Sequence, residues 1–505
     1  MPHYTPNFTF MKRFFLFLFV FLTACTGTRP ERNGHNASAK NPRERVIASV
    51  DSLFNAPLFN HAHWGVLVKS LKTDEIWYER NADKMFMPAS NEKIITGAVS
   101  LQKLGPDFRY ITTIGHRGSI VNGVLKGDLL VFGSGDPSFN FRFWDDNRAV
   151  LKKWAKELKN RGIREITGDL IGDDNAFEDY PYGSGWPYDD FDYYYSAEVG
   201  AFQLNENYID LEITPPRTSG EAMKVQPSIP SRYYTIENNL QVVPNGSNRI
   251  TISRPFGTNR LMLKGQVTLG GSSVTDAITI TNPTLFFMTV FKEVLEDEGI
   301  KISGTARDCD DIASYNGKPT DVTVLISEQS PPFSKLLAEM MKVSQNLYAE
   351  TFTKTLGWQT TGTGSFEAGK SVVQQQLAEW GIPPNTYVYA DGSGLSRYNY
   401  TNPRILSNIL TQMRHSPNWL VFKESMPIAG VDGTIRNRMK TGAAFNNLRA
   451  KTGTIANTRS LSGYLTTADG EELVFSFMVN GHLLSSRDAD RITDTAANLL
   501  AGLKR

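Results

Sequence analysis

The sequence of 505 residues contains very little cysteine. Its two cysteines, Cys25 and Cys309, cannot form a disulfide framework or a cysteine-rich zinc site. The seven histidines are scattered, without a His-Glu-x-x-His pair or another metal-ligand spacing. Nothing in the sequence therefore calls for a metal ion or a cofactor, and Cys309 is interpreted as a lone thiol of no special reactivity.

An excess of charge of one sign is also missing. Lysine and arginine number 53 and aspartate and glutamate 52, which leaves a formal net charge of +1. Nucleic-acid-binding proteins usually carry a strong basic excess because much of their affinity comes from neutralising phosphates. The composition therefore argues against a nucleic-acid partner. The chain is 40% hydrophobic and 21% charged, and it is long enough for two or three globular domains.

The apolar run near the N-terminus is too short to cross a bilayer, which needs about 20 helical residues. It has nine residues, Phe14 to Leu22, and follows the basic Met11-Lys12-Arg13, as in a signal peptide. Leu22-Thr23-Ala24-Cys25 resembles the processing site of bacterial lipoproteins. A buried N-terminal strand is the alternative interpretation. We predict export to the cell envelope or periplasm with a signal peptide at 11–25, a lipid anchor on Cys25 that attaches the protein to a membrane, and a polar tether at 26–41.

The remaining chain alternates between helical and strand-like patterns. Apolar residues at helical spacing come first and last, and short alternating runs with Gly, Asn and Pro turns fill the middle. This order indicates one α/β domain, 42–107 plus 303–505, interrupted by a β-rich insertion at 108–302. The predicted helices are 43–54, 90–104, 333–356, 365–380, 404–413 and 488–503, and the predicted strands include 64–71, 75–79, 110–115, 128–133, 448–451, 461–465 and 473–479.

One segment of the insertion, 186–195, is dense in aromatic and acidic residues. It could form a small aromatic core of the accessory region or a wall of a binding cleft. The sequence does not separate these two interpretations.

Ser90 and Lys93 stand near the start of the first strong helix. Residues three apart share one helix face, so the Lys93 amine can reach the Ser90 hydroxyl. A serine beside a desolvated, neutral lysine is an activated nucleophile. Ser100 and Lys103 repeat the spacing, but they lie on another helix face and are interpreted as solvated surface.

Ser344 and Asn346 lie inside the predicted helix 333–356. They place a hydroxyl and an amide close together, able to relay a proton and to hold a substrate carbonyl. The pattern is weak on its own, and Ser416-Pro417-Asn418 is a chance copy that its proline turns into a loop.

Lys451-Thr452-Gly453-Thr454 follows strand-like residues. Lys451 supplies positive charge for a carboxylate, the threonines supply hydroxyls, and Gly453 would let a ligand approach the strand backbone. Lys440-Thr441-Gly442 is a second copy, but it continues into a loop-like segment.

The order Ser-x-x-Lys, Ser-x-Asn, Lys-Thr-Gly is that of penicillin-binding proteins and β-lactamases. From about residue 43 onward, the chain resembles the serine D-alanyl-D-alanine carboxypeptidase/endopeptidase family of penicillin-binding protein 4 type, the class C penicillin-binding proteins of low molecular mass. The resemblance implies an α/β, penicillin-recognising serine transferase fold in which two nested β-rich subdomains follow the nucleophile helix. Further similar segments are Phe86-Met-Pro-Ala-Ser, Gly133-Ser-Gly-Asp-Pro, Gly168-Asp-Leu-Ile-Gly, Tyr193-Tyr-Tyr-Ser-Ala, Asp391-Gly-Ser-Gly-Leu and Gly433-Thr-Ile-Arg-Asn.

The resemblance also implies roles for the three motifs in cleaving peptidoglycan stem peptides. Ser90 would attack the carbonyl of the penultimate D-Ala while Lys93 takes its proton. Ser344, helped by Lys451, would protonate the leaving D-Ala, and Asn346 would position the acyl chain. The further implied roles are an oxyanion hole from the backbone N–H groups of Ser90 and Thr454, carboxylate binding by Thr452 and Thr454, and covalent inhibition by β-lactams.

Two other functions remain open at this point. A β-lactamase would share the acylation machinery, but no Glu-x-x-Leu-Asn segment for deacylation occurs between Asn346 and Lys451. A non-catalytic sensor of β-lactams or cell wall would not explain the complete nucleophile set. For catalysis Lys93 must be neutral, and we expect burial near Lys451, a second cation, to lower its pKa from about 10.4.

Overall fold

The computed structural model describes residues 41–313 and 315–505. The predicted signal peptide, the lipid-anchor residue Cys25 and all of the predicted tether except Asn41 lie outside the described residues. Within the described ranges, no helix combines the length and the apolar character needed to cross a membrane.

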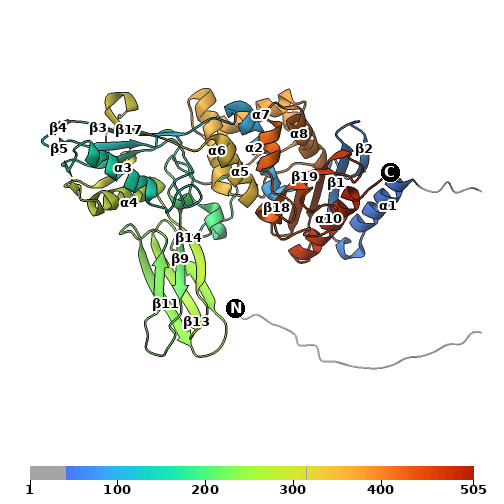
Figure 1. Cartoon of the computed structure of the whole chain (residues 1–505), viewed down its shortest axis with the longest axis horizontal. Helices are drawn as coiled ribbons and strands as arrows, with labels where there is room; N and C mark the ends of the chain where they lie inside the picture. The colour runs from blue at the N-terminus through green and yellow to red at the C-terminus, as the bar shows by residue number, and fades with distance from the viewer. Residues whose placement is uncertain (1–40, 314) are drawn as a thin grey trace, which may run out of the picture. The chain divides into compact units, whose positions relative to one another are not determined.

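A five-stranded antiparallel sheet joins the two ends of the described chain (Figure 1). The predicted first hairpin is confirmed, and its first strand pairs with the last strand of the chain. The sheet order is β18-β19-β20-β1-β2, with β1 at His63–Ser70, β2 at Ile76–Arg80, β18 at Arg449–Ile455, β19 at Thr458–Thr466 and β20 at Glu472–Asn480.

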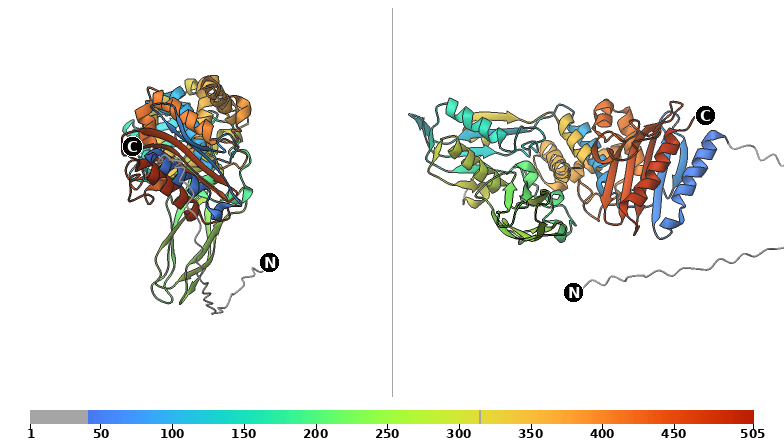
Figure 2. Two further views of the ribbon diagram at one scale, coloured as in Figure 1. Left: turned by 90° about the vertical axis from the view of Figure 1, so that its right-hand side faces the viewer. Right: turned by 60° about the horizontal axis from the view of Figure 1, so that its bottom comes forward.

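Helices cover both faces of this sheet. On one face α1 (Pro42–Phe54) lies beside α10 (Ser486–Ala501), and α10 packs on β19 (Figure 2). On the other face α8 (Pro403–His415) packs on β20 and β1. A sheet buried on both faces needs apolar residues on both, which explains the almost continuous apolar run of β20.

Helix α2 (Glu92–Leu104), which follows the turn that holds Ser90, is the buried centre of the helical layer. It contacts α8 and the three helices α5 (Phe333–Val343), α6 (Asn346–Thr361) and α7 (Phe366–Glu379). Because neighbours surround it, Ser100 is fully buried rather than on the solvated surface that the sequence predicted.

The predicted helix 333–356 is wrong in one respect, because it is two helices. Ser344 has a φ of 66° and ends α5 in the left-handed region, and the Gln345 side chain then caps α6 by accepting from the Leu347 N–H. Apolar residues continue at helical spacing across the break, so the periodicity could not reveal it. The break presents Ser344 at the end of one helix and Asn346 at the start of the next.

Two sheets and two helices form the first part of the insertion. One sheet has the order β16-β8-β6-β3-β17 and the other β15-β7-β5-β4, with α3 (Ala149–Asn160) and α4 (Pro283–Asp297) alongside. The strands are β3 Ile111–His116, β4 Ser119–Val121, β5 Val124–Lys126, β6 Leu129–Phe132, β7 Glu165–Ile166, β8 Leu170–Asp173, β15 Lys301–Ile302, β16 Ala306–Asp308 and β17 Thr323–Gln329.

The end of the insertion differs from the predicted boundary at 302. β16 pairs with β8 and β17 pairs with β3, so the sheet of the insertion continues to Gln329. The strands near the boundary, β15 and β16, have only two and three residues, too few for an alternating pattern to show which sheet they join.

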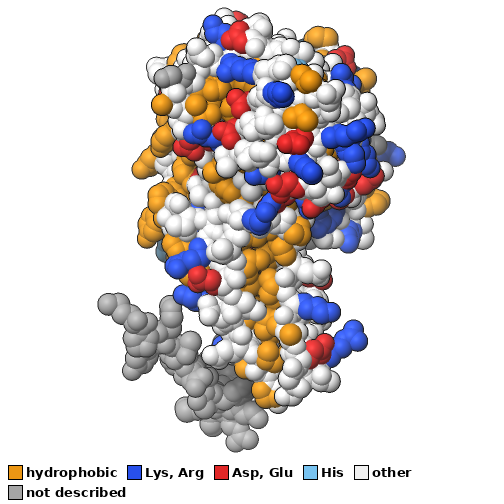
Figure 3. All heavy atoms as spheres, turned by 90° about the vertical axis from the view of Figure 1, so that its left-hand side faces the viewer, with side chains coloured by type: hydrophobic (Ala, Val, Ile, Leu, Met, Phe, Trp, Pro, Cys, Tyr) orange, Lys and Arg blue, Asp and Glu red, His pale blue; other side chains and the backbone are white. Residues whose placement is uncertain are grey.

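Six further strands form two three-stranded sheets nested within the insertion. The sheets are ordered β10-β9-β14 and β11-β13-β12. Figure 3 shows hydrophobic side chains in a stripe along this unit, while charges of both signs are interspersed over the rest of that face. The strands are β9 Tyr208–Thr214, β10 Lys224–Pro227, β11 Thr235–Val243, β12 Arg249–Ser253, β13 Arg260–Thr268 and β14 Val274–Thr279.

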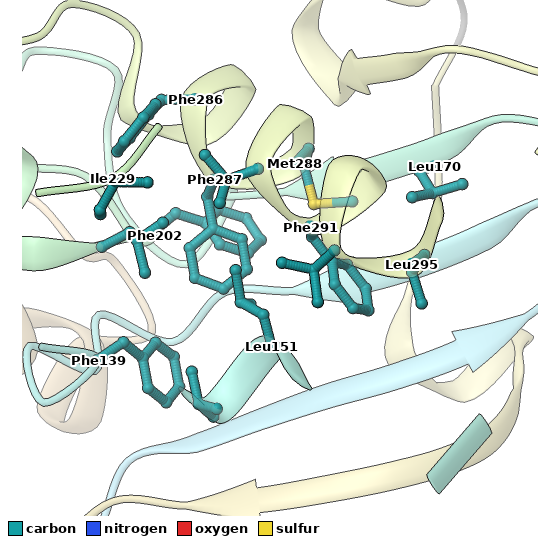
Figure 4. Packing of buried hydrophobic residues seen from close by; sticks show 14 of the residues in the cluster. Phe139, Leu151, Leu170, Phe202, Ile229, Phe286, Phe287, Met288, Phe291 and Leu295 are labelled. Carbon is teal, nitrogen blue, oxygen red and sulfur yellow. The ribbon is translucent and has the colours of Figure 1, made fainter. Parts of the chain in front are cut away.

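A large apolar cluster of the insertion surrounds α4. Phe286, Phe287, Met288 and Phe291 are fully buried, and Phe202 packs against Phe287 (Figure 4). This cluster also includes residues of both nested sheets, so the six-stranded unit is anchored through the same core.

Candidate active site

One cleft of about 1230 Å³ brings the three sequence motifs together. Ser90, Ser344 and Asn346 line it, together with Thr452 and Thr454. Lys93 and Lys451 are fully buried immediately behind these residues. Residues of the insertion, among them Asp189, Asp190, Tyr194 and Tyr195, line the cleft as well.

Ser90 lies in a single 3-10 turn, Ala89–Asn91, just before α2. Ala89 precedes it with a φ of 49°, a strained conformation for a residue with a side chain. Gly394 packs against the Ala89 carbonyl so closely that a Cβ on it would lie 1.8 Å from that oxygen. The turn that carries Ser90 is therefore held in position by backbone packing.

Lys93 has three polar neighbours. Its Nζ donates to Asn346 Oδ1 at 2.6 Å and to the Ser393 carbonyl at 2.6 Å, and lies 3.1 Å from Ser90 Oγ. A neutral amine has two N–H bonds and one lone pair. With both N–H bonds directed to acceptors, the lone pair is left for the Ser90 hydroxyl proton, which is the arrangement a general base needs.

Burial explains why this lysine can be neutral. Desolvation lowers the pKa of Lys93 to about 7, although the carboxyl groups of Asp391, Glu350 and Glu92 act in the opposite direction. The expected contribution of Lys451 is not among the causes. Instead, Lys93 influences Lys451. Desolvation and, second, the charge of Lys93 lower the pKa of Lys451 well below its usual value.

Ser344 and Lys451 form a second serine–lysine pair across the cleft. Lys451 Nζ donates to Ser344 Oγ at 2.8 Å and to the Thr452 carbonyl at 2.9 Å. The left-handed conformation of Ser344 turns its side chain toward β18, where Lys451 lies. This pair can deliver a proton to a group bound between Ser344 and Ser90.

The Lys-Thr-Gly-Thr segment forms most of β18, an edge strand of the sheet. Thr452 and Thr454 face the cleft, and Thr452 Oγ1 donates to Thr434 Oγ1 at 2.8 Å. Gly453 is buried and does not line the cleft. A Cβ there would lie 2.5 Å from the Pro88 carbonyl. Glycine is therefore required because the turn that carries Ser90 approaches β18 closely. The sequence had predicted instead that a ligand approaches the strand at this glycine.

Two buried carboxyl groups that received no role from the sequence orient the Ser393 carbonyl. Glu350 accepts from the backbone N–H groups of Gly392 and Ser393 at 3.0 and 2.8 Å. Asp391 accepts from the Asn399 amide at 2.6 Å and from the N–H groups of two further residues of this loop, Gly394 and Ser396, each at 2.7 Å. In the sequence, Asp391 could be noticed only because the segment Asp391-Gly-Ser-Gly-Leu resembles the family.

The segment 186–195 of the insertion touches this network at two points. Trp186 Nε1 donates to Asp391 Oδ2 at 2.8 Å, and the Tyr195 carbonyl accepts from Asn346 Nδ2 at 2.7 Å. The second contact directs Asn346 Oδ1 toward Lys93. Both open interpretations of the segment hold, because it forms an aromatic cluster around Trp186 and also a wall of the cleft.

Comparison with known proteins agrees with this geometry. A model of the D-Ala-D-Ala carboxypeptidase 3 (S13) family matches residues 46–503. The chain belongs to this S13 family.

Two relatives are similar over most of their length. The D-alanyl-D-alanine carboxypeptidase of Actinomadura sp. is 31% identical over 454 residues, 86% of this chain and 80% of the relative. D-alanyl-D-alanine carboxypeptidase DacB of Haemophilus influenzae is 28% identical over 425 residues, 83% of this chain and 85% of the relative. The predicted enzyme class is confirmed: this S13 protein is a serine-type D-Ala-D-Ala carboxypeptidase.

Solved structures confirm the predicted fold class. The crystal structure of penicillin-binding protein 4 (dacB) from Haemophilus influenzae has a TM-score of 0.77 and 26% identity, covering 90% of this chain and 99% of that one. A second structure of the Haemophilus protein, complexed with a novel β-lactam, has a TM-score of 0.71 and 24% identity, covering 90% and 98%. The S13 chain thus has an α/β fold with extra β-sheets inserted.

The chance copies of the motifs lie away from the catalytic groups. Lys440 is exposed in a loop, and Ser416 lies in the turn between α8 and α9 (Trp419–Ser425). Cys309 also lies outside the cleft, within 4.8 Å of a group of carboxylate oxygens from Asp174, Asp308 and Asp310. Burial raises the pKa of the Cys309 thiol, which makes it a poor nucleophile, as expected for a thiol of no special reactivity.

Proposed function

We propose that this S13 carboxypeptidase works through an acyl-enzyme on Ser90. The Ser90 oxygen attacks the carbonyl of the penultimate D-Ala as Lys93 accepts its proton. The observation that carries this assignment is the Lys93 environment, in which two acceptors occupy the N–H bonds and leave the lone pair for Ser90. The same acceptors stabilise the ammonium that forms on proton transfer.

The other side of the cleft serves the leaving group. Ser344 passes a proton to the amine of the departing D-Ala, and Lys451 supports that transfer through its hydrogen bond to Ser344 Oγ. Thr452 and Thr454 hold the terminal carboxylate, and Asn346 orients the acyl chain. The backbone N–H groups of Ser90 and Thr454 form the oxyanion hole of this mechanism.

β-Lactams would enter the same reaction as substitutes for D-Ala-D-Ala. Attack by Ser90 opens the lactam ring and leaves the acyl group on the enzyme. The sequence between Asn346 and Lys451 lacks the Glu-x-x-Leu-Asn segment that activates a deacylating water in many β-lactamases. We therefore expect a long-lived penicilloyl adduct, and the β-lactam complex of the Haemophilus relative supports this expectation.

The substrate class also bears on location and on the range of peptides cleaved. Peptidoglycan lies outside the cytoplasmic membrane, so we propose export and attachment through a lipid on Cys25. The size of the cleft supports cleavage of D-Ala cross-bridges in addition to terminal D-Ala. If Cys25→Ala leaves processing and membrane association unchanged, the anchor proposal fails.

The nucleophile assignment is tested with labelled penicillin. We expect Ser90→Ala to lose labelling by penicillin. It should also lose the release of D-Ala from muropeptides, which is measured by mass spectrometry. Ser100→Ala is the matched control, because its buried hydroxyl has no hydrogen-bond partner among the described residues and its loss should cost little. Labelling of Ser100, or retained labelling in Ser90→Ala, would refute the assignment.

A further inference from the structure

A strained turn of the insertion contacts the second motif, Ser344-Gln345-Asn346. Asn205, Glu206 and Asn207 have φ values of 49°, 56° and 57° in succession, all in the left-handed region. Left-handed residues other than glycine normally occur singly, because the Cβ atom makes this conformation unfavourable. Such a run persists only where surrounding contacts fix it, and this one leads directly into β9.

Glu206 directs its carboxylate from this turn into the protein. The side chain is fully buried, and it accepts from Arg142 Nε at 2.7 Å and from the Tyr208 hydroxyl at 3.2 Å. Arg142 Nη2 also donates to Glu206 Oε2, at 3.4 Å, and the second motif contacts the same oxygen because Gln345 Nε2 donates to it. A buried carboxylate that accepts from several donors fixes the geometry of each donor.

Gln345 is the residue between Ser344 and Asn346, and its side chain is held at both ends. Its Oε1 accepts from the Leu347 N–H at 3.3 Å, which caps α6, and its Nε2 is held by Glu206. Two left-handed stretches, one at Ser344 and one at Asn205–Asn207, are thus joined through one side chain.

We propose that Glu206 is a positioning residue for catalysis, which acts through Gln345 to fix Ser344 and Asn346 against their lysine partners. Ser344 Oγ and Asn346 Oδ1 lie 2.8 and 2.6 Å from Lys451 and Lys93, distances that a small rotation of Gln345 would change. Displacements of about 1 Å in an active site can cost about 100-fold in rate. The inference deepens the proposed function and rests on the roles given there to Ser344 and Asn346.

Glu206→Gln and Glu339→Gln form a matched pair of tests. Both residues face Arg142, but Glu339 lies 3.8 Å from it on α5 and, among the described residues, makes no hydrogen bond to Gln345. We expect Glu206→Gln to lower kcat for D-Ala release about tenfold with KM changed less than about threefold. Glu339→Gln should stay within about twofold of the parent protein. Equal losses in the two variants would overturn the proposal.

Exchanging the two side chains separates positioning from simple destabilisation. Gln345→Glu keeps the helix cap but sets two carboxylates against each other, and we expect kcat to fall about 100-fold. The double variant Glu206→Gln/Gln345→Glu restores a donor–acceptor pair in reverse. We expect it to recover at least about tenfold over Gln345→Glu at an unchanged melting temperature. Absence of this recovery would refute the proposal, even if Glu206→Gln alone does not fold.

Ser344→Ala distinguishes failure of the inference from failure of the proposed function. If Ser344→Ala keeps the parent rate, the proposed role of Ser344 fails and the positioning role fails with it. If Ser344→Ala is inactive while the exchange shows no recovery, only the positioning role of Glu206 is wrong.

Discussion

The α/β layer and the insertion contribute different things to one cleft. In the mechanism proposed above, the layer supplies the side chains that react or transfer protons: Ser90, Lys93, Ser344 and Lys451. The insertion supplies groups that hold these side chains in place, among them the Trp186 indole, a peptide carbonyl at Tyr195 and the Glu206 carboxylate. The difference teaches that, in the proposed mechanism, loops and short turns of the insertion complete the geometry of the cleft while the layer provides the chemistry.

The largest expected effect removes the base from the α/β layer. Lys93→Arg keeps a positive charge, but a guanidinium does not lose its proton in proteins and has no lone pair for Ser90. We expect acylation by labelled penicillin and by D-Ala-D-Ala peptides to fall roughly 100- to 10,000-fold, the usual contribution of a general base. Circular dichroism should show a folded protein. Substantial labelling of a folded Lys93→Arg would remove Lys93 from the mechanism.

The second effect is the pH dependence of the same base. The pKa of Lys93 lies at about 7, so below that pH the amine is increasingly protonated and cannot accept the Ser90 proton. The acylation rate constant should therefore fall about tenfold per pH unit below about 7 and level off above it. Measurement of penicillin labelling rates from about pH 5 to pH 9 tests this. A flat profile through the acid range, with the melting temperature unchanged, would contradict a neutral Lys93.

The third effect concerns close packing within the layer. Gly453→Ala places a methyl group against the Pro88 carbonyl and Ser460 Oγ, so the nucleophile turn must move away from β18. We expect a loss of about 1–3 kcal/mol in the free energy of unfolding and about tenfold slower labelling. Gly200→Ala in the insertion is the control, because its nearest heavy atom would be 3.8 Å away. A harmless Gly453→Ala would return Gly453 to the ligand-approach role predicted from the sequence.

A smaller effect tests the insertion directly. Trp186→Phe removes the hydrogen bond to Asp391 and so loosens the loop that presents the Ser393 carbonyl to Lys93. Loss of one hydrogen bond to a charged group costs about 1.5–3 kcal/mol, and we expect kcat to fall about fivefold to tenfold. Trp144→Phe is the matched control, since the Trp144 indole N–H has no hydrogen-bond partner in the described part of the chain. If both variants behave alike, Trp186 contributes only to packing.

The smallest effect is expected at the exposed copy of the third motif. Lys440→Ala removes a side chain in a loop outside the cleft, and activity should stay within about twofold of the parent protein. A strong loss of D-Ala release in steady-state assays would show that the choice between the two Lys-Thr-Gly segments is wrong.

Contacts between residues close in sequence could be predicted from their spacing. Ser90, in the turn before α2, and Lys93, in the first turn of α2, are three residues apart, and contact at this distance follows from helix geometry. The order of the three motifs indicated the fold class and the enzyme class. The break at Ser344 could not be predicted, because a single left-handed serine leaves no trace in an apolar pattern.

Contacts between distant segments account for what the sequence analysis missed. Trp186 meets Asp391 across 205 residues and Asn346 meets Tyr195 across 151, and neither separation leaves a periodic signal. The continuation of the inserted sheet to Gln329 has the same cause, since β17 finds its partner β3 far earlier in the chain. These contacts are specified by tertiary packing, not by local propensity.

The pairing of β1 with β20 has a consequence for how the chain acquires its structure. β1 is synthesised early, yet its partner β20 is among the last segments to be synthesised. Close by, the Met87 N–H donates to Asn480 Oδ1 across 393 residues. Closing so long a loop is slow, and β1 has an unpaired edge until then. We expect the catalytic layer to assemble only after the C-terminal strands have emerged. The insertion lies wholly between these strands and can fold first, so it would act as the scaffold on which the layer closes.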